Sequence, residues 1–117
     1  MALTMLKIHH QYFSDRNEAV AEIQDNQLHL MEFEVPSVDN SVHWHRFDAT
    51  LYMLAGTLNL TEGATGEVHR VTVGDKVMLP EGTLHAERSE GYTVLLGSSI
   101  PAEQFDNPVD LPPEALP

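Results

Sequence analysis

The chain has 117 residues, 42% of them hydrophobic, and 18 acidic against 6 basic residues give it a formal net charge of −12. This length suffices for one domain, and no apolar run approaches the roughly 18 residues that cross a membrane. The negative charge disfavours nucleic acid and anionic membranes as partners, because both would repel the protein. The absence of cysteine excludes disulfides, thiolate metal ligands and cysteine nucleophiles.

The N-terminal segment shows no targeting signal. Its first seven residues lack the basic start and apolar core of a signal peptide, which predicts a cytoplasmic protein. His9 and His10 follow in a segment typical of an edge strand or an arm. Adjacent strand residues face opposite ways, so these two imidazoles are not expected to chelate one ion.

The segment from residue 14 to residue 35 has two interpretations. Asp15 and Glu18 have the spacing of a capping box, which indicates a helix start. The alternative, which we favour, is a hairpin of strands 19–23 and 27–35. In the second strand, apolar residues at 31, 33 and 35 alternate with glutamates. That alternation puts His29 on the apolar face, either in a cavity or as a hydrogen-bonded core histidine.

Two histidines, His43 and His45, stand two positions apart ahead of an apolar run that ends at Gly56. Alternate residues of a strand share a face, so both imidazoles can point the same way. A third histidine, His85, follows a short strand and a turn that contains Pro80 and Gly82. Three convergent imidazoles are the outline of a metal site.

The remaining elements are short strands separated by turns. A hairpin is expected from strands 57–61 and 68–73, and further strands at 77–79 and 92–97. This spacing describes an antiparallel sandwich or barrel. After residue 98 the prolines predict an extended tail, either free or packed across its own barrel or a neighbour's.

Residues 37–89 resemble the two sequence motifs of the cupin superfamily. The first motif is a His-x-His pair followed by Glu and Gly, and the second is Gly, Pro-x-Gly, His and Asn. Ser37 and Ser89 stand at the first Gly and the final Asn. The matching positions, with the internal spacing of the family, are His43, His45, Gly56, Gly74, Pro80, Gly82 and His85.

The resemblance implies an all-β fold, a double-stranded β-helix or jelly-roll barrel. It implies a single cupin domain over residues 1–117, with a barrel core at about 19–98 and a Pro-rich tail at 99–117. A homodimer is also implied, with a divalent metal inside the barrel. The ligands carried over are His43, His45 and His85; Fe(II) is the ion favoured, with Zn, Mn, Ni or Cu as alternatives.

The family's glutamate ligand falls on Ala49, which has no donor atom, and the next residue, Thr50, is a weak neutral ligand. Asp48 would face the opposite side of a regular strand unless a bulge turned it inward. The resemblance therefore indicates a three-histidine site, as in thiol-oxidising, gentisate-type and diketone-cleaving dioxygenases. A metal held only by neutral imidazoles keeps its double charge and favours an anionic or enolisable substrate.

The expected function is that of an Fe(II) dioxygenase-type oxidoreductase acting on a small polar or anionic substrate. The alternatives are a non-catalytic cupin that binds or senses a small molecule, and a metal-dependent isomerase or lyase. Tyr52, Arg88 and Tyr92 flank the motifs and are candidates to orient an anion or a carbonyl.

Overall fold

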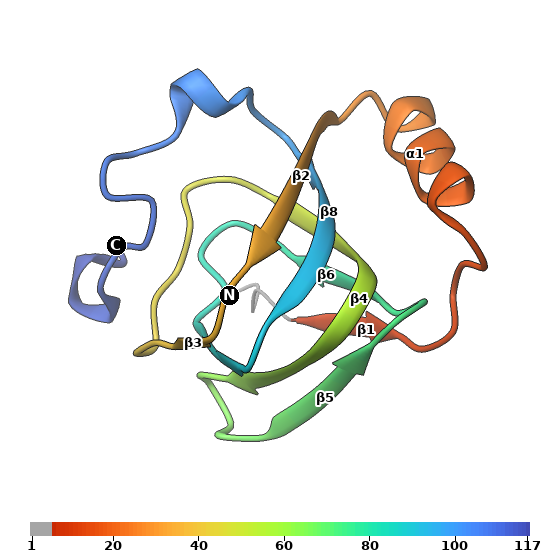
Figure 1. Ribbon diagram of the computed structural model, residues 1–117. Helices are drawn as coiled ribbons and strands as arrows, with labels where there is room; N and C mark the ends of the chain where they lie inside the picture. Colours follow the sequence, from red (N-terminus) through yellow and green to blue (C-terminus); the bar gives the residue numbers. More distant parts are fainter. Residues whose placement is uncertain (1–5) are drawn as a thin grey trace.

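The computed structural model describes residues 6–117 (Figure 1). Residues 1–5, over which no signal peptide is expected, lie outside the described range. Strands wind into a barrel, helix α1 lies outside it, and the C-terminal tail passes over one end (Figure 1). None of the described helices has the length and apolarity to cross a membrane. The all-β jelly-roll fold expected from the sequence is confirmed.

The longest strand, β4, connects two sheets. Its first half pairs with β6 and β8, and its second half pairs with β5 and β7. Strands β1 and β2 extend the first sheet, and β3 extends the second. The elements are β1 (Lys7–His9), α1 (Arg16–Asp25), β2 (His29–Val35), β3 (Val38–Asp39), β4 (Ala49–Glu62), β5 (Val68–Thr72), β6 (Lys76–Leu79), β7 (His85–Ser89), β8 (Tyr92–Ser98), and the 3-10 turns Ala102–Gln104 and Pro113–Ala115.

The interior of the barrel is apolar. Alternate residues of β4 point inward, because successive side chains of a strand face opposite sides of a sheet. The pairing of β4 with β8 shifts register between Met53 and Ala55 and ends at Gly56, and from Thr57 onward β4 pairs with the second sheet. The fully buried members of this interior core are Met53, Leu58, Leu60, Val71 and Val77.

Residues 16–25 form a helix, so the first strand of the predicted hairpin is wrong. Asp15 caps the helix by accepting a hydrogen bond from the Glu18 amide, and the Glu18 carboxylate accepts one from the Ser14 amide. Ala19 and Ile23 lie one helical turn apart and are buried against the outer face of the barrel. Capping and a buried apolar face together stabilise the helix over the strand. The second predicted strand is confirmed as β2.

His29 is exposed, so its expected place in a cavity or core is wrong. Strand β2 pairs only with β8 and lies at the edge of its sheet. Its residues therefore receive little cover, and only Met31 and Val35 pack against the barrel core. The alternation correctly predicted a strand but did not show how far its apolar face would be covered.

The tail packs across its own barrel. Leu111 forms an antiparallel bridge with Trp44, and its amide and carbonyl groups bond those of Trp44 at 3.0 and 3.1 Å. This corresponds to one of the placements expected for a Pro-rich extended segment. The homodimer stays a prediction.

Gly56 lies at the junction between the two sheets, so substituting it tests how closely the backbone segments approach there. Its φ is +81°, and a Cβ there would lie 2.3 Å from the Gly91 carbonyl oxygen. Gly66 has a similar φ of +79° but open space around it. We expect G66A to lower the free energy of unfolding by about 1–2 kcal/mol, the cost of the left-handed backbone. G56A should lower it by about 2–5 kcal/mol, because overpacking adds to that cost.

Urea denaturation of both variants measures the two values. Equal losses for G56A and G66A would contradict a close approach of β4 to Gly91.

Candidate metal centre

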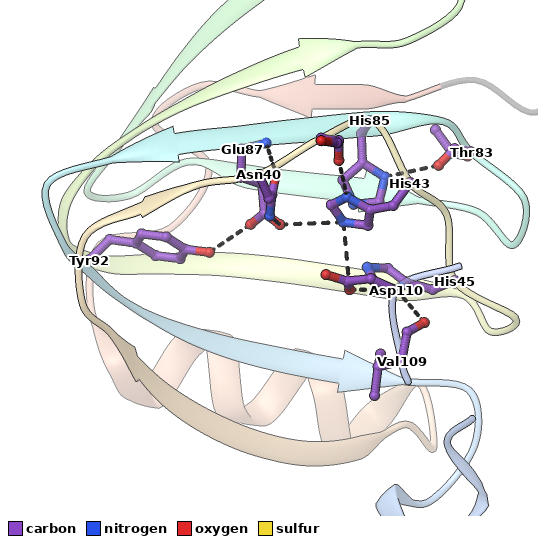
Figure 2. Close-up of polar contacts among 10 residues, drawn as sticks. Asn40, His43, His45, Thr83, His85, Glu87, Tyr92, Val109 and Asp110 are labelled. Atoms are coloured by element: carbon purple, nitrogen blue, oxygen red, sulfur yellow. Dashed lines mark hydrogen bonds and ion pairs between the residues drawn. The ribbon is translucent and has the colours of Figure 1, made fainter. Parts of the chain in front are cut away.

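His43, His45 and His85 come together at one end of the barrel (Figure 2). Each offers one ring nitrogen, and these atoms lie within 4.8 Å of one another. The ring centres of His43 and His85 are 4.4 Å apart, and His45 lies 5.1 and 5.0 Å from them. The convergence expected from the motif spacing is therefore present.

Backbone carbonyls orient all three rings. The Nδ1 atoms of His43, His85 and His45 lie 2.7, 2.9 and 3.3 Å from the carbonyl oxygens of Ser41, Thr83 and Val109. A carbonyl can only accept a hydrogen bond, so each Nδ1 carries the proton. Each Nε2 then keeps a free lone pair, which is how metal-binding histidines are commonly held.

The segment around the first two histidines is not a regular strand. His43 forms an isolated bridge with His85, in which each amide bonds the other's carbonyl at 2.9 Å. Strand β4 begins only at Ala49. The expected strand through His43 and His45 is thus wrong in detail, although both rings still face the same cluster.

Burial favours the neutral form of His45 and His85. His43 is 4% exposed and His85 is 2% exposed. Burial, together with the adjacent His43 and His45, lowers the pKa of His85 to about 4 against the opposing hydrogen bond to Thr83. Burial likewise lowers the pKa of His45. Neutral imidazoles are the form that binds a metal.

The donor set fits a metal ion. The Nε2 of His43 is buried and has no hydrogen-bond partner among the described residues. A buried polar atom without a partner costs free energy, and a cation between the three Nε2 atoms would supply one. Imidazole suits Zn, Cu, Fe and Ni alike, so these ligands do not distinguish among the ions expected.

Two carboxylates that sequence reasoning missed lie beside the cluster. Glu87 Oε1 is 3.6 Å from His43 Nε2. Asp110 Oδ1 is 3.7 Å from the same atom and 3.6 Å from His45 Nδ1. Glu87 had a detectable signal, because it follows His85 by two residues on one strand and therefore shares its face. Asp110 comes from the tail, which no motif connected with the site.

Glu87 is held by two neighbours (Figure 2). The Tyr92 hydroxyl donates to Glu87 Oε2 at 2.7 Å, and Asn40 Nδ2 donates to Oε1 at 3.3 Å. Burial raises the pKa of Tyr92, and the Glu87 charge raises it further. Tyr92 therefore stays a neutral hydrogen-bond donor, and it fixes the carboxylate in place.

Tyr92 is the one flanking candidate that reaches this network. Tyr52 is fully buried on the other side of β4, where its hydroxyl donates to Glu22 of α1. Arg88 is exposed and alternates with Glu87 along β7, so it points away from the cluster. Tyr52 and Arg88 therefore have no place at the histidine site.

The residues around the missing glutamate ligand contribute no donor. Ala49 is 5% exposed and belongs to the apolar core. Asp48 is exposed, and its Oδ1 accepts a hydrogen bond from the Glu81 amide at 2.8 Å. The register shift in β4 lies between Met53 and Ala55, too far along the strand to turn Asp48 inward.

The histidines have an opening to solvent. A cleft of about 400 Å³ is lined by residues 40–43 on one side and 110–114 on the other, and it includes His43 and Asp110. A larger cleft of about 800 Å³, lined by Asn59, Arg70 and Arg88 among others, contains none of the three histidines. The smaller cleft is thus the one from which a ligand would reach the cluster.

Comparison with known proteins gives structural matches. No protein-family model and no curated protein sequence matches the chain. Among solved structures, the polyketide cyclase RemF from Streptomyces resistomycificus is 26% identical over 59% of this chain, with a TM-score of 0.53. The match spans 51% of RemF, about half its length.

Two further structures share the fold. A DUF861 family protein from Thermotoga maritima is 21% identical over 80% of this chain and 98% of that one, with a TM-score of 0.54. An RmlC-like cupin from Shewanella frigidimarina is 20% identical over 63% of this chain and 69% of that one, with a TM-score of 0.50. With the motif positions and the barrel, these matches show that the chain has the cupin fold.

Proposed function

We propose that the protein is a metal-dependent enzyme that moves a proton at the carbon next to a carbonyl group, in the isomerisation or cyclisation of a small polar or anionic substrate. The observation that carries this proposal is the Glu87 carboxylate, 3.6 Å from His43 Nε2 and hydrogen-bonded to Tyr92. A positioned carboxylate beside a Lewis-acid site is the arrangement that such proton transfer needs.

The residues divide into two roles. His43, His45 and His85 would hold a divalent ion, which when bound polarises the substrate carbonyl and makes the neighbouring C–H bond more acidic. Glu87 would accept that proton and return it to another atom of the substrate. Tyr92 would keep one Glu87 oxygen occupied, so that the other faces the cluster. No oxidant is required, because the electrons remain on the substrate.

The similarity to the polyketide cyclase supports this class of reaction. RemF, at 26% identity, is a cyclase. The match covers 51% of RemF, so we do not infer its substrate for this protein. The entrance cleft of about 400 Å³ is at the small end of the range for ligand pockets and favours a small molecule.

A second candidate is the three-histidine Fe(II) dioxygenase expected from the sequence. The three imidazoles, each with its Nδ1 bonded to a carbonyl oxygen and its Nε2 left for a metal, favour it. The sequence favoured an anionic substrate because a metal held only by imidazoles would keep its double charge. Glu87 and Asp110 weaken that argument, because two carboxylates beside the cluster would reduce the positive charge at the metal.

Metal binding is the first test. Mixed anaerobically with Fe(II), the protein should bind about one equivalent of metal. We expect H85A to weaken binding by more than about a hundredfold, since even outer partners of a ligand contribute 10- to 100-fold. H29A is the matched control, because His29 is exposed on β2. Metal analysis after gel filtration, with circular dichroism to verify folding, measures the effect.

Binding below a tenth of an equivalent, or equal binding by H85A and the wild-type protein, would contradict the metal site.

Proton transfer is the second test. The metal-loaded protein is incubated in D₂O with small carbonyl compounds such as pyruvate and acetylacetone, and NMR follows deuterium incorporation next to the carbonyl. E87Q should slow incorporation by about 10²- to 10⁴-fold, the range for a lost acid–base group. Y92F should slow it less, because it removes only the hydrogen bond that positions Glu87.

Oxygen consumption is measured in parallel with an oxygen electrode. Oxygen consumption without deuterium incorporation would favour the dioxygenase. Tight binding of a small molecule with neither signal would favour a non-catalytic cupin.

A further inference from the structure

We propose that the C-terminal tail completes the metal site, and that Asp110 supplies the carboxylate ligand that the cupin motif lacks at Ala49. The inference rests on the proposed metal site. It concerns the ligand set of that site and does not depend on which reaction follows.

The tail lies along the segment that carries His45. Ser99 and Asp48 exchange two hydrogen bonds, from the Ser99 amide to the Asp48 carbonyl at 3.0 Å and from the Asp48 amide to Ser99 Oγ at 2.9 Å. Further along, Phe105 stacks on Phe47 with ring centres 4.3 Å apart. Because later tail residues meet earlier residues of the segment, the two run antiparallel.

The contacts continue to the first histidines. Asp106 pairs with Arg46 at 3.2 Å, and the Val109 carbonyl accepts from His45. Phe47 in turn stacks on the His45 ring, with centres 5.3 Å apart. The tail therefore holds in place a segment that belongs to no regular strand.

Asp110 is fixed from both sides. Its predecessor Val109 faces His45, and its successor Leu111 is bridged to Trp44. Trp44 is 1% exposed, and its Nε1 donates to the Pro112 carbonyl at 2.9 Å. The position of the Asp110 backbone is thus determined by a buried anchor rather than by the carboxylate itself.

The distances suit a shared cation better than a hydrogen bond. Asp110 Oδ1 lies 3.7 Å from His43 Nε2, beyond the usual hydrogen-bond limit of about 3.2 Å. Two donors bound to one ion at about 2.1 Å stand about 3.0–3.4 Å apart. A small closing movement of the side chain would therefore bring Asp110 into coordination.

Asp110 is also the less constrained of the two carboxylates. Both oxygens of Glu87 accept hydrogen bonds, from Asn40 and Tyr92. In residues 6–117 no hydrogen-bond donor reaches the Asp110 carboxylate, whose side chain is 54% exposed at the rim of the entrance cleft. Glu87 is therefore held for proton transfer, and Asp110 is free to bind the ion.

The test compares two tail aspartates. D110N keeps the shape of the side chain and removes its charge, while D106N does the same at a residue that pairs with Arg46 outside the cluster. We expect D110N to weaken Zn²⁺ binding by at least about tenfold in calorimetry, and D106N to leave it unchanged. The visible spectrum of the Co²⁺-loaded protein should change in D110N alone, because it reports the coordination sphere.

Equal Zn²⁺ affinity and equal Co²⁺ spectra for D110N and the wild-type protein would overturn the assignment of Asp110, while leaving the three-histidine site intact. No Zn²⁺ binding by the wild-type protein would overturn both that site and the inference. Thermal unfolding of the metal-free variants verifies that each is folded.

Discussion

The hydrogen bond from each histidine Nδ1 to a backbone carbonyl is the constraint on which the centre depends. It fixes the tautomer and aims Nε2 at the common point. For His43 and His85 the carbonyl belongs to the residue two positions earlier, so each ring is oriented by its own segment. For His45 the carbonyl is that of Val109. One of the three histidines is therefore oriented by the tail.

The barrel brings these segments together. Strand β4 serves both sheets, and the close approach of Gly56 to Gly91 allows it to pass from one to the other. In its second half, β4 pairs with β7 from Asn59 to Glu62, and this register sets His85 at the end of the barrel. The mutual backbone bonds between His43 and His85 then join the two motifs directly.

The sequence predicted the parts that depend on local pattern and motif spacing. Strands β2, β4, β5, β6 and β8 and the meeting of three histidines follow from alternation, turn residues and the cupin motifs, whereas the short β3 and the polar β7 were not predicted. Helix α1 was the less favoured of two interpretations because the same residues satisfy a short strand, and burial of Ala19 and Ile23 against the barrel adds to the Asp15 cap in deciding for the helix. Such burial is a tertiary effect that a short window does not contain.

The carboxylates Glu87 and Asp110 likewise differ in whether a local sequence pattern could predict their positions. Glu87 could be found from parity, because it shares a strand face with His85. Asp110 could not, because its position depends on Trp44 and Phe47 holding a tail that has no strand of its own. The short distance from Asp110 to the histidines results from contacts that the tail makes elsewhere.

A ligand carried by the tail has a thermodynamic consequence. If β4 supplied the carboxylate, the barrel alone would define the site. With Asp110 in that role, an ion that binds the assembled site also stabilises the packed tail, by linkage between binding and folding. The linkage is reciprocal, so a buried contact that fixes the Asp110 backbone, such as the Trp44 side chain far from the carboxylate oxygens, contributes to metal affinity. The absence of a donor at Ala49 thereby couples the metal centre to the C-terminal segment.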